Sequence, residues 1–404
     1  MNSMEGCILN NKINYMSYVS IYMFYFFALG IISTIMSIYL NDEGKTAFEI
    51  SIIISSGGIF SIFIQPLFGY LVDKTQKTIF LIVLFLILAS IFALLLPVTR
   101  ETIALCLLYG FIFSLINAVS PINEKLATES SYKYGYIRIW GAIGFSLASQ
   151  TSTLIYENTN DSFIFYVFSF SILFTLFGYT YLYKSNLKSI NSKHIANNVT
   201  IKELIRKILF NQMFIIFLII NLLFTGMTTV SNVYLPIFLN EKGISLSLVG
   251  TIILVATLLE IPLILFSNVI IDKLSTKNLL LLVVIMILIQ FSIYGIMNNA
   301  VIIAIGTILL KASSTMLFIM ITLKATSNTV SSHFVNSALS LAATVKALGG
   351  ILFQLFSGFF IDKFSIQTLY TSFIFFALMM IIILIFKFKI SENENNNLFS
   401  GNKN

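Results

Sequence analysis

The sequence predicts an all-α membrane protein of twelve transmembrane helices, arranged as two pseudo-symmetric six-helix bundles. The first observation behind this prediction is composition. Hydrophobic residues make up 57% of the 404-residue chain and charged residues only 10%, whereas soluble proteins carry about 25% charged residues. Since a soluble core of this size cannot bury so much apolar surface, we expect most of it to face the lipid bilayer.

The second observation is an internal repeat. The sequence Tyr-Leu-Asn-Asp-Glu-Gly at 39–44 returns as Phe-Leu-Asn-Glu-Lys-Gly at 238–243, and Asp73-Lys74 returns as Asp272-Lys273. Both pairs are 199 positions apart. The chain therefore holds two copies of one unit of about 200 residues. Duplicated membrane halves are typical of secondary transporters.

The third observation is a series of apolar runs, each close to the roughly 20 residues that a transmembrane helix needs. Backbone polar groups inside the bilayer must be satisfied within each segment, and the alternation typical of a β-barrel is absent, so the runs are predicted to be helices. They lie at 15–40, 47–72, 79–98, 102–123, 133–156, 162–183, 212–239, 246–271, 278–298, 300–323, 334–361 and 367–388.

These runs divide the chain into four parts. Residues 1–183 are predicted to form the first bundle and 212–388 the second. The segment 184–211 between them carries six basic residues and is predicted to be a cytoplasmic linker. The tail at 389–404 is polar and rich in asparagine, which predicts disorder.

The net charge of +7 is interpreted as membrane topology rather than as a sign of nucleic-acid binding, because the basic residues fall in predicted loops. With the N-terminus inside the cell, seventeen of them lie on the cytoplasmic side and four on the opposite side. This bias predicts a protein of the cytoplasmic membrane with both termini in the cytoplasm.

Cysteine and histidine do not point to a metal site, a disulfide framework or a cofactor. Cys7, Cys106, His194 and His333 show no zinc or disulfide spacing. The first apolar run is too long for a cleavable signal peptide and is predicted to be a retained span. No nucleophile motif or histidine box is present, so we do not expect an enzyme.

Four charged residues fall inside the predicted spans, where each costs about 2.5–3.5 kcal/mol on insertion scales. They are Glu260, Arg138, Lys311 and Lys346. A carboxyl group such as that of Glu260 can load and release a proton or bind solute. Alternatively, Glu260 forms a structural ion pair with Lys311 or Lys346. Pro262 is expected to bend or loosen the helix beside it.

The three intramembrane cations allow two interpretations each. Lys311 and Lys346 lie midway along their spans, where they either line a cavity or pair with another helix. Arg138 could be a helix-end arginine, but Trp140 and the stripe formed by Gly141 and Gly144 favour a binding role. A guanidinium beside aromatic rings can hold hydroxyl or carboxylate groups, and the glycines let another helix approach closely.

Polar residues within spans are candidates for the wall of a cavity, of which Asn117 and Asn232 are the clearest. Each could instead make a helix–helix hydrogen bond. Three intramembrane cations against one anion leave about +2, which favours a solute with a carboxylate, a phosphate or many hydroxyl groups.

The loop after the second span resembles the signature loop of the major facilitator superfamily. The family pattern is a glycine, an aspartate four residues later and then basic residues, and the chain has Gly69, Asp73, Lys74 and Lys77. Gln76 replaces the second glycine of the pattern. The resemblance implies a gating loop at Gly69, Asp73 and Lys74, with a second copy at Asp272 and Lys273.

Within that superfamily, Pro121-Ile-Asn-Glu124-Lys125 and Gly135-Tyr-Ile-Arg138-Ile-Trp140-Gly141 resemble the lactose-permease-like symporters. The resemblance implies that Arg138 grips the solute, that Phe145 stacks on a sugar ring and that Lys346 pairs with an acidic residue of span 7.

The chain departs from that branch in three places. Span 7 has no acidic residue, and Ser120 stands where the family has an acid one turn above the partner glutamate of its arginine. Span 10 lacks the His and Glu pair of the family, with Ser314 and Leu317 in that region. A proton circuit of the lactose-permease type cannot be carried over, which leaves Glu260 as the expected coupling group.

These features together predict a monomeric secondary transporter that moves a sugar, nucleoside or organic acid by alternating access, coupled to protons as a symporter. Alternatives are a uniporter, a proton-antiport exporter of drug-like solutes, and a non-transporting membrane sensor. A sensor would need a sizeable soluble domain, yet the longest predicted non-membrane stretch is 184–211.

Overall fold

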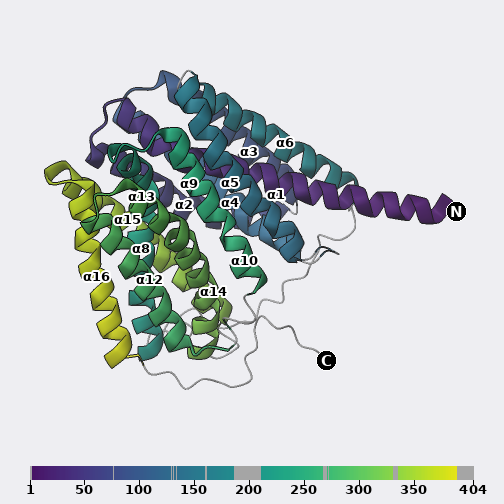
Figure 1. The fold of residues 1–404 in the computed structure, drawn as a ribbon. Coiled ribbons are helices and arrows are strands. Elements are labelled where there is room, and N and C mark those ends of the chain that lie inside the picture. The colour runs from purple at the N-terminus through teal and green to yellow at the C-terminus, as the bar shows by residue number, and fades with distance from the viewer. Residues whose placement is uncertain are drawn as a thin grey trace. The chain divides into compact units, whose positions relative to one another are not determined.

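The computed structural model describes residues 2–75, 77–128, 130, 132, 134–159, 162–185, 211–266, 271, 273–330 and 335–388. Every regular element among these residues is a helix, which confirms the predicted all-α fold class (Figure 1). The predicted linker lies outside the described residues from 186 to 210, and so does the predicted tail at 389–404.

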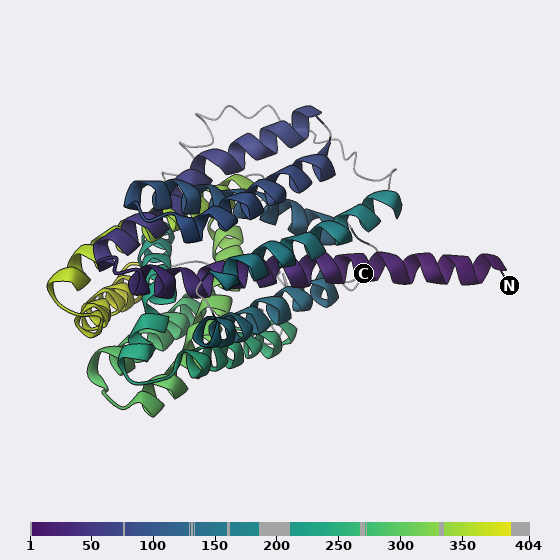
Figure 2. The ribbon, with the colours of Figure 1, turned by 90° about the horizontal axis from the view of Figure 1, so that it is seen from above.

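The first half contains six long helices at nearly the predicted positions. They are α1 (Asn2–Asp42), α2 (Ala47–Thr75), α3 (Thr78–Leu95) with the short 3₁₀ helix η1 (Leu96–Val98), α4 (Thr102–Thr128), α5 (Tyr134–Asn158) and α6 (Phe163–Ser185). The first turns of α1 extend past its neighbours α5 and α6 (Figures 1 and 2).

The second half contains the same number of spans, but two of them are interrupted. The unbroken helices are α8 (Gln212–Glu241), α12 (Thr276–Ile296), α15 (Val335–Lys363) and α16 (Ile366–Phe386). Predicted span 8 is divided into α9 (Leu246–Leu258) and α10 (Glu260–Leu265). Predicted span 10 consists of α13 (Ala300–Gly306), a π-helical turn η2 (Thr307–Lys311) and α14 (Ala312–Thr329).

Eleven helical segments of the described chain are long and apolar enough to cross a membrane. The twelfth predicted span is α5, which carries Arg138, Gln150 and several serine and threonine residues and is correspondingly less apolar. Polar residues are tolerated in a membrane helix whose neighbours satisfy them.

The chain forms two compact units. One comprises Met1–Ile195 together with Ser245–Leu254, and the other comprises Ala196–Ile244 together with Val255–Asn404. The first turns of α9 thus belong with the first six helices. They contact α5, since the amide of Ser247 donates to Glu157 over 3.0 Å, and a side chain at Gly250 would collide with Thr153.

The repeat is visible in the loop after the first helix of each half. Gly44 and Gly243 have φ values of +76° and +84°, the left-handed region that favours glycine. The amide of Lys45 donates to the Leu40 carbonyl over 3.0 Å, and the amide of Ile244 donates to the Leu239 carbonyl over 3.1 Å. Both helices therefore end in the same Schellman-type turn.

Glycines also bring the first and fifth helices of each half together. A Cβ at Gly144 of α5 would collide with the Met23 carbonyl of α1, and a Cβ at Gly349 of α15 would lie 2.5 Å from the Leu222 carbonyl of α8. The predicted close approach at Gly141 and Gly144 is confirmed, and the helix that approaches is α1.

Candidate functional site

Arg138 of α5 forms the central ion pair of the first half. Its Nε lies 3.5 Å from Oε1 of Glu124, and its guanidinium carbon lies 4.4 Å from the centroid of the Phe26 ring of α1. About a third of each charged side chain is exposed. Glu124 lies one residue beyond the predicted span 102–123, but α4 continues to Thr128, so Glu124 stands on this helix.

Aromatic and hydroxyl groups surround this pair. The buried Tyr25 donates to the Ile116 carbonyl over 2.8 Å and lies close to Ser120, Glu124 and Arg138. The Arg138–Glu124 pair therefore offers adjacent donor and acceptor groups beside an aromatic ring, an arrangement that suits hydroxyl-bearing solutes.

Three other predicted residues of the first half have different surroundings. Trp140 donates its indole N–H to the Tyr15 hydroxyl over 3.1 Å, which ties α5 to α1. Asn117 donates to the Phe113 carbonyl of its own helix over 2.9 Å. Phe145 is half-buried. Among the described contacts, none joins Trp140, Asn117 or Phe145 to Arg138.

Glu260 stands at a break in the helix of span 8. α9 ends at Leu258, Leu259 forms a turn, and α10 begins at Glu260. Pro262, two residues after Glu260, causes this break. It has no N–H to donate to the Leu258 carbonyl, and its ring crowds that carbonyl. The predicted loosening of this helix is confirmed.

Lys311 stands at a second irregularity, the π-helical turn Thr307–Lys311. Such turns are rare and often occur at functional sites. Hydroxyl groups satisfy the backbone around it: Ser314 and Thr315 donate to the Lys311 carbonyl over 3.1 Å and 2.9 Å. Thr307 is held to Tyr294 of α12 by a hydrogen bond of 2.8 Å.

Glu260 and Lys311 interact electrostatically, and α10 packs against α14, the helix that follows Lys311. Lys346, by contrast, has no ion-pair or hydrogen-bond partner in the described part of the chain. Of the two cations expected as alternatives, Lys311 is the one whose electrostatic interaction with Glu260 is described, and their pairing stays a prediction. Lys346 on α15 and Asn232 on α8 are both exposed although each lies well within a span.

The predicted gating residues lie where α2 ends. Gly69 is exposed with open space beside it, and the Lys74 ammonium lies 5.6 Å from the centroid of the Tyr70 ring. In the second copy, Lys273 is exposed. Asp272 and the side chain of Asp73 lie outside what the structure describes, so the predicted charge contacts of this loop stay a prediction.

Lys324, just after the predicted span 300–323, is one of the seventeen basic residues assigned to cytoplasmic loops, and for this residue the prediction is wrong. The helix α14 continues to Thr329, and Lys324 is buried within it. Its ammonium donates to the carbonyls of Ile271 and Leu274 over 2.7 Å each. The apolar run gave no signal of this role, because it ends at Leu323 and the contact is made by distant backbone. Lys324 thus braces the segment that holds the second copy of the loop motif.

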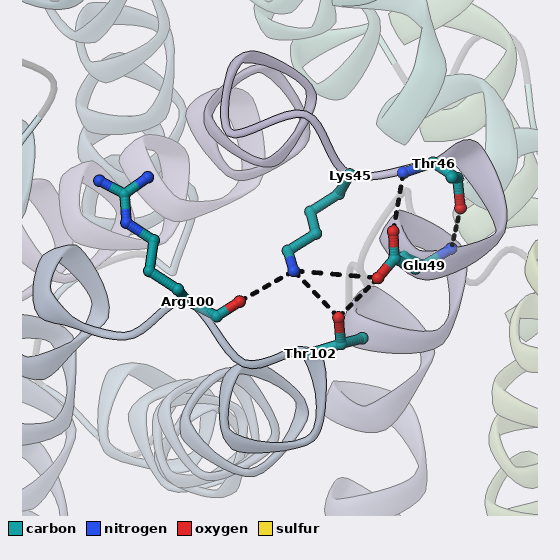
Figure 3. Close-up of polar contacts among 5 residues, drawn as sticks. All are labelled: Lys45, Thr46, Glu49, Arg100 and Thr102. Carbon is teal, nitrogen blue, oxygen red and sulfur yellow. Dashed lines mark hydrogen bonds and ion pairs between the residues drawn. The ribbon is translucent and has the colours of Figure 1, made fainter.

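A polar cluster at the other end of the first half ties its loops together (Figure 3). Lys45 donates to the Arg100 carbonyl over 2.8 Å and to the Thr102 hydroxyl over 3.0 Å. Glu49 accepts from Thr102 over 2.6 Å and from the Thr46 amide over 3.0 Å. In the second half, Lys242 makes the corresponding tie by donating to Asn298 over 3.1 Å.

Residues 15–372 match the model of the MFS_1 like family. The chain belongs to this family. The match covers nearly the whole molecule and confirms the predicted relationship to the major facilitator superfamily. The protein is thus a multi-pass membrane transporter of small solutes and not an enzyme.

Two relatives are each 26% identical to the chain. One is described as an uncharacterized transporter, YwbF, of Bacillus subtilis (strain 168), aligned over 375 residues and 91% of both chains. The other is a maltose permease of Geobacillus stearothermophilus, aligned over 266 residues, or 65% of this chain and 66% of the relative.

Solved structures show the same fold. A variant of the nucleoside transporter NupG matches with a TM-score of 0.80 at 18% identity, covering 93% of this chain and all of that one. A peptide transporter POT in complex with sulfate matches with a TM-score of 0.70 at 12% identity, covering 92% and 93%.

Proposed function

We propose that this transporter is a proton-coupled symporter for a small polar or anionic organic solute. The observation that carries the proposal is the attraction between Glu260 and Lys311, because each stands where its membrane helix is irregular. Irregular backbone at membrane depth is tolerated where it is buried in protein or lines a cavity, and in transporters it marks solute and coupling-ion sites.

Protonation of Glu260 would remove its attraction to Lys311, which stands at the N-cap of α14. A rearrangement here would break few backbone hydrogen bonds. The Leu258 carbonyl already lacks its ordinary helical donor, and the π-helical turn already departs from α-helical pairing. Loading and release of one proton could thus shift the balance between two arrangements of the second half, which is the coupling that a symporter needs.

The Arg138–Glu124 pair is proposed to bind the solute. It presents a guanidinium and a carboxylate side by side with the Phe26 ring. Two of the similar proteins are named as a maltose permease and a nucleoside transporter. These names support a solute rich in hydroxyl groups.

We also propose the orientation of the chain in the membrane and the residues that close its cytoplasmic side. With Lys324 assigned to a helix, sixteen basic residues remain on the predicted cytoplasmic side against four on the other. This bias supports cytoplasmic termini in the cell membrane. Asp73 and Lys74 are proposed to close the cytoplasmic side, and the monomer is proposed to be the working unit.

The test uses purified full-length protein in proteoliposomes and a labelled solute chosen from a panel of sugars, nucleosides and organic acids. Glu260→Gln should abolish accumulation against a gradient while passive exchange persists, because exchange needs no net proton movement. Glu241→Gln, a matched change at the end of α8, should accumulate normally. Equal accumulation by Glu260→Gln and wild type would exclude Glu260 as the coupling group.

A pH jump determines the direction of coupling. A symporter takes up solute faster when the outside is acidic, whereas an antiporter does the reverse. Uptake that is indifferent to the proton gradient in the wild type would identify a uniporter and overturn the proposed coupling.

A further inference from the structure

The helices α8 and α15 pack side by side in one register. The Asn221 side chain donates to the Ala342 carbonyl over 2.8 Å. Eight residues later on both helices, a Cβ at Gly350 would lie 3.3 Å from the Thr229 hydroxyl. The two helices therefore run in the same direction, and position 346 of α15 lies level with Thr225 of α8.

Lys346 belongs to the face of α15 that meets α8. It lies one turn after Ala342 and one turn before Gly350, and residues four apart share one face of an α-helix. Gly349 and Gly350 both place their Cβ positions against α8, so Lys346, one turn earlier, lies on the side of α15 that faces α8. The Lys346 side chain is exposed among these neighbours, so its ammonium is accessible beside α8.

Three polar side chains on these two helices lack partners, and Asn232 lies nearly one turn after Thr229 on α8. Among the described residues, Lys346, Thr229 and Asn232 make no hydrogen bond or ion pair through their side chains. Asn232 is the exposed exception in a stretch of α8 that is otherwise buried or half-buried between Ile220 and Leu239. Polar groups at membrane depth require water or a ligand, since leaving them unsatisfied is costly.

The charges of the molecule single out Lys346. Arg138 is compensated by Glu124, and Lys311 interacts with Glu260. Lys324, buried in α14, donates to the carbonyls of Ile271 and Leu274. Counting Glu124 and Lys324 with the four charges expected from the sequence leaves the excess at about +2. Of these cations, Lys346 is the one that has no hydrogen-bond or ion-pair partner among the described residues. An ammonium, a hydroxyl and an amide N–H₂ can all donate, which is the combination that a carboxylate or phosphate accepts.

We propose that Lys346, Thr229 and Asn232 form an anion subsite that binds a carboxylate or phosphate group of the transported solute. The inference rests on the proposed function and narrows it to an anionic solute. Lys346 lies about 6 Å along the axis from Gly350, and Asn232 about 4.5 Å from Thr229. The seam therefore spans about 10 Å, enough for one anionic group and the adjoining part of a small organic molecule.

The test is ligand-dependent thermal stabilisation of the purified full-length protein. The probes are glucose, glucuronate and glucose 6-phosphate, uridine and uridine monophosphate, and inorganic phosphate. An anionic member should raise the unfolding temperature of the wild type more than its neutral counterpart does. Lys346→Met should weaken the apparent affinity for that anion by roughly 10-fold or more, and Lys346→Arg should retain most of it.

Two further variants separate a lost charge from a damaged fold. Lys363→Met makes the same change in an exposed lysine at the end of α15 and should keep the anion response. Thr229→Val preserves side-chain shape and should weaken the anion response without affecting the unfolding temperature of the ligand-free protein by more than a few degrees.

The subsite is overturned if neutral probes stabilise as well as anionic ones, if Lys346→Met responds like the wild type, or if no anion in the panel stabilises the wild type. Failure of the proposed function appears differently. Charge-dependent binding without proton-driven accumulation would keep the subsite and remove the symport mechanism. Proton-driven accumulation of a neutral solute by Lys346→Met would keep the symport mechanism and remove the subsite.

Discussion

The two halves of the transporter end their first helices in the same turn, but their interacting acidic and basic residues lie on different kinds of backbone. In the first half, Glu124 and Arg138 lie on the unbroken helices α4 and α5. In the second half, Glu260 follows a break in span 8 and Lys311 ends a π-helical turn in span 10.

The difference indicates that the two halves of the molecule have different roles in transport. A regular helix holds its side chains in fixed positions, because any shift must break hydrogen bonds that are already made. A helix interrupted at the charged residue has fewer such bonds to lose, so it rearranges at lower cost. We infer that the ion pair of the first half helps to bind the solute and that the interrupted helices of the second half respond to the proton.

The largest effect on stability is expected from separating the charges of the second half. Lys311→Met leaves Glu260 without its cation and should cost about 3 kcal/mol. Glu260→Gln in the same protein should restore most of that loss, because no uncompensated charge remains. Chemical unfolding of the two single variants and the double variant measures this coupling.

The matched cycle in the first half uses Arg138→Met and Glu124→Gln. This pair is about one-third exposed, so we expect a coupling of about 1 kcal/mol or less. Equal coupling free energies in the two halves would show that their charge pairs do not differ in this way.

A similar loss is expected where the two halves agree, at the glycines between their first and fifth helices. Gly144→Val would place a side chain against the Met23 backbone and should cost about 3 kcal/mol. Gly135→Val, at the start of the same helix, meets open space and should cost about 1 kcal/mol or less. Unfolding temperatures in detergent compare the two, and similar values would contradict the close approach of α1.

A smaller effect is expected from restoring the broken helix. Pro262→Ala supplies an N–H for the Leu258 carbonyl, so it should raise stability by about 1 kcal/mol and slow proton-driven uptake. The matched change in the first half is Pro121→Ala, within α4, which is continuous despite its proline. Faster uptake by Pro262→Ala would show that the break is not needed for transport.

The smallest effects are expected at the repeated turn. Gly44→Ala and Gly243→Ala each force a side chain into the left-handed region and should cost about 1 kcal/mol. Since both turns have the same hydrogen bonds and similar φ values, the two losses should agree within a few tenths of a kcal/mol. A marked difference in unfolding free energy would show that the turns differ in their surroundings.

The sequence by itself determined the helical membrane fold, the positions of the spans and the twofold repeat. Hydropathy and length are local properties, and a chain of this composition has few ways to satisfy its backbone inside a bilayer. The turn glycines were recognisable for the same reason, since Gly44 and Gly243 recur at one spacing. Pro262 could be expected to disturb its helix, because the missing N–H is a property of the residue itself.

Only the tertiary structure decided which charges meet. That Glu260 interacts with Lys311, that Glu124 reaches Arg138, and that Lys324 is buried against distant carbonyls all depend on how the helices are rotated and packed. The π-helical turn before Lys311 alters that rotation by the phase of a single residue, about 100°. Hydropathy does not depend on this rotation, because the same residues stay in the same span whichever neighbour they face.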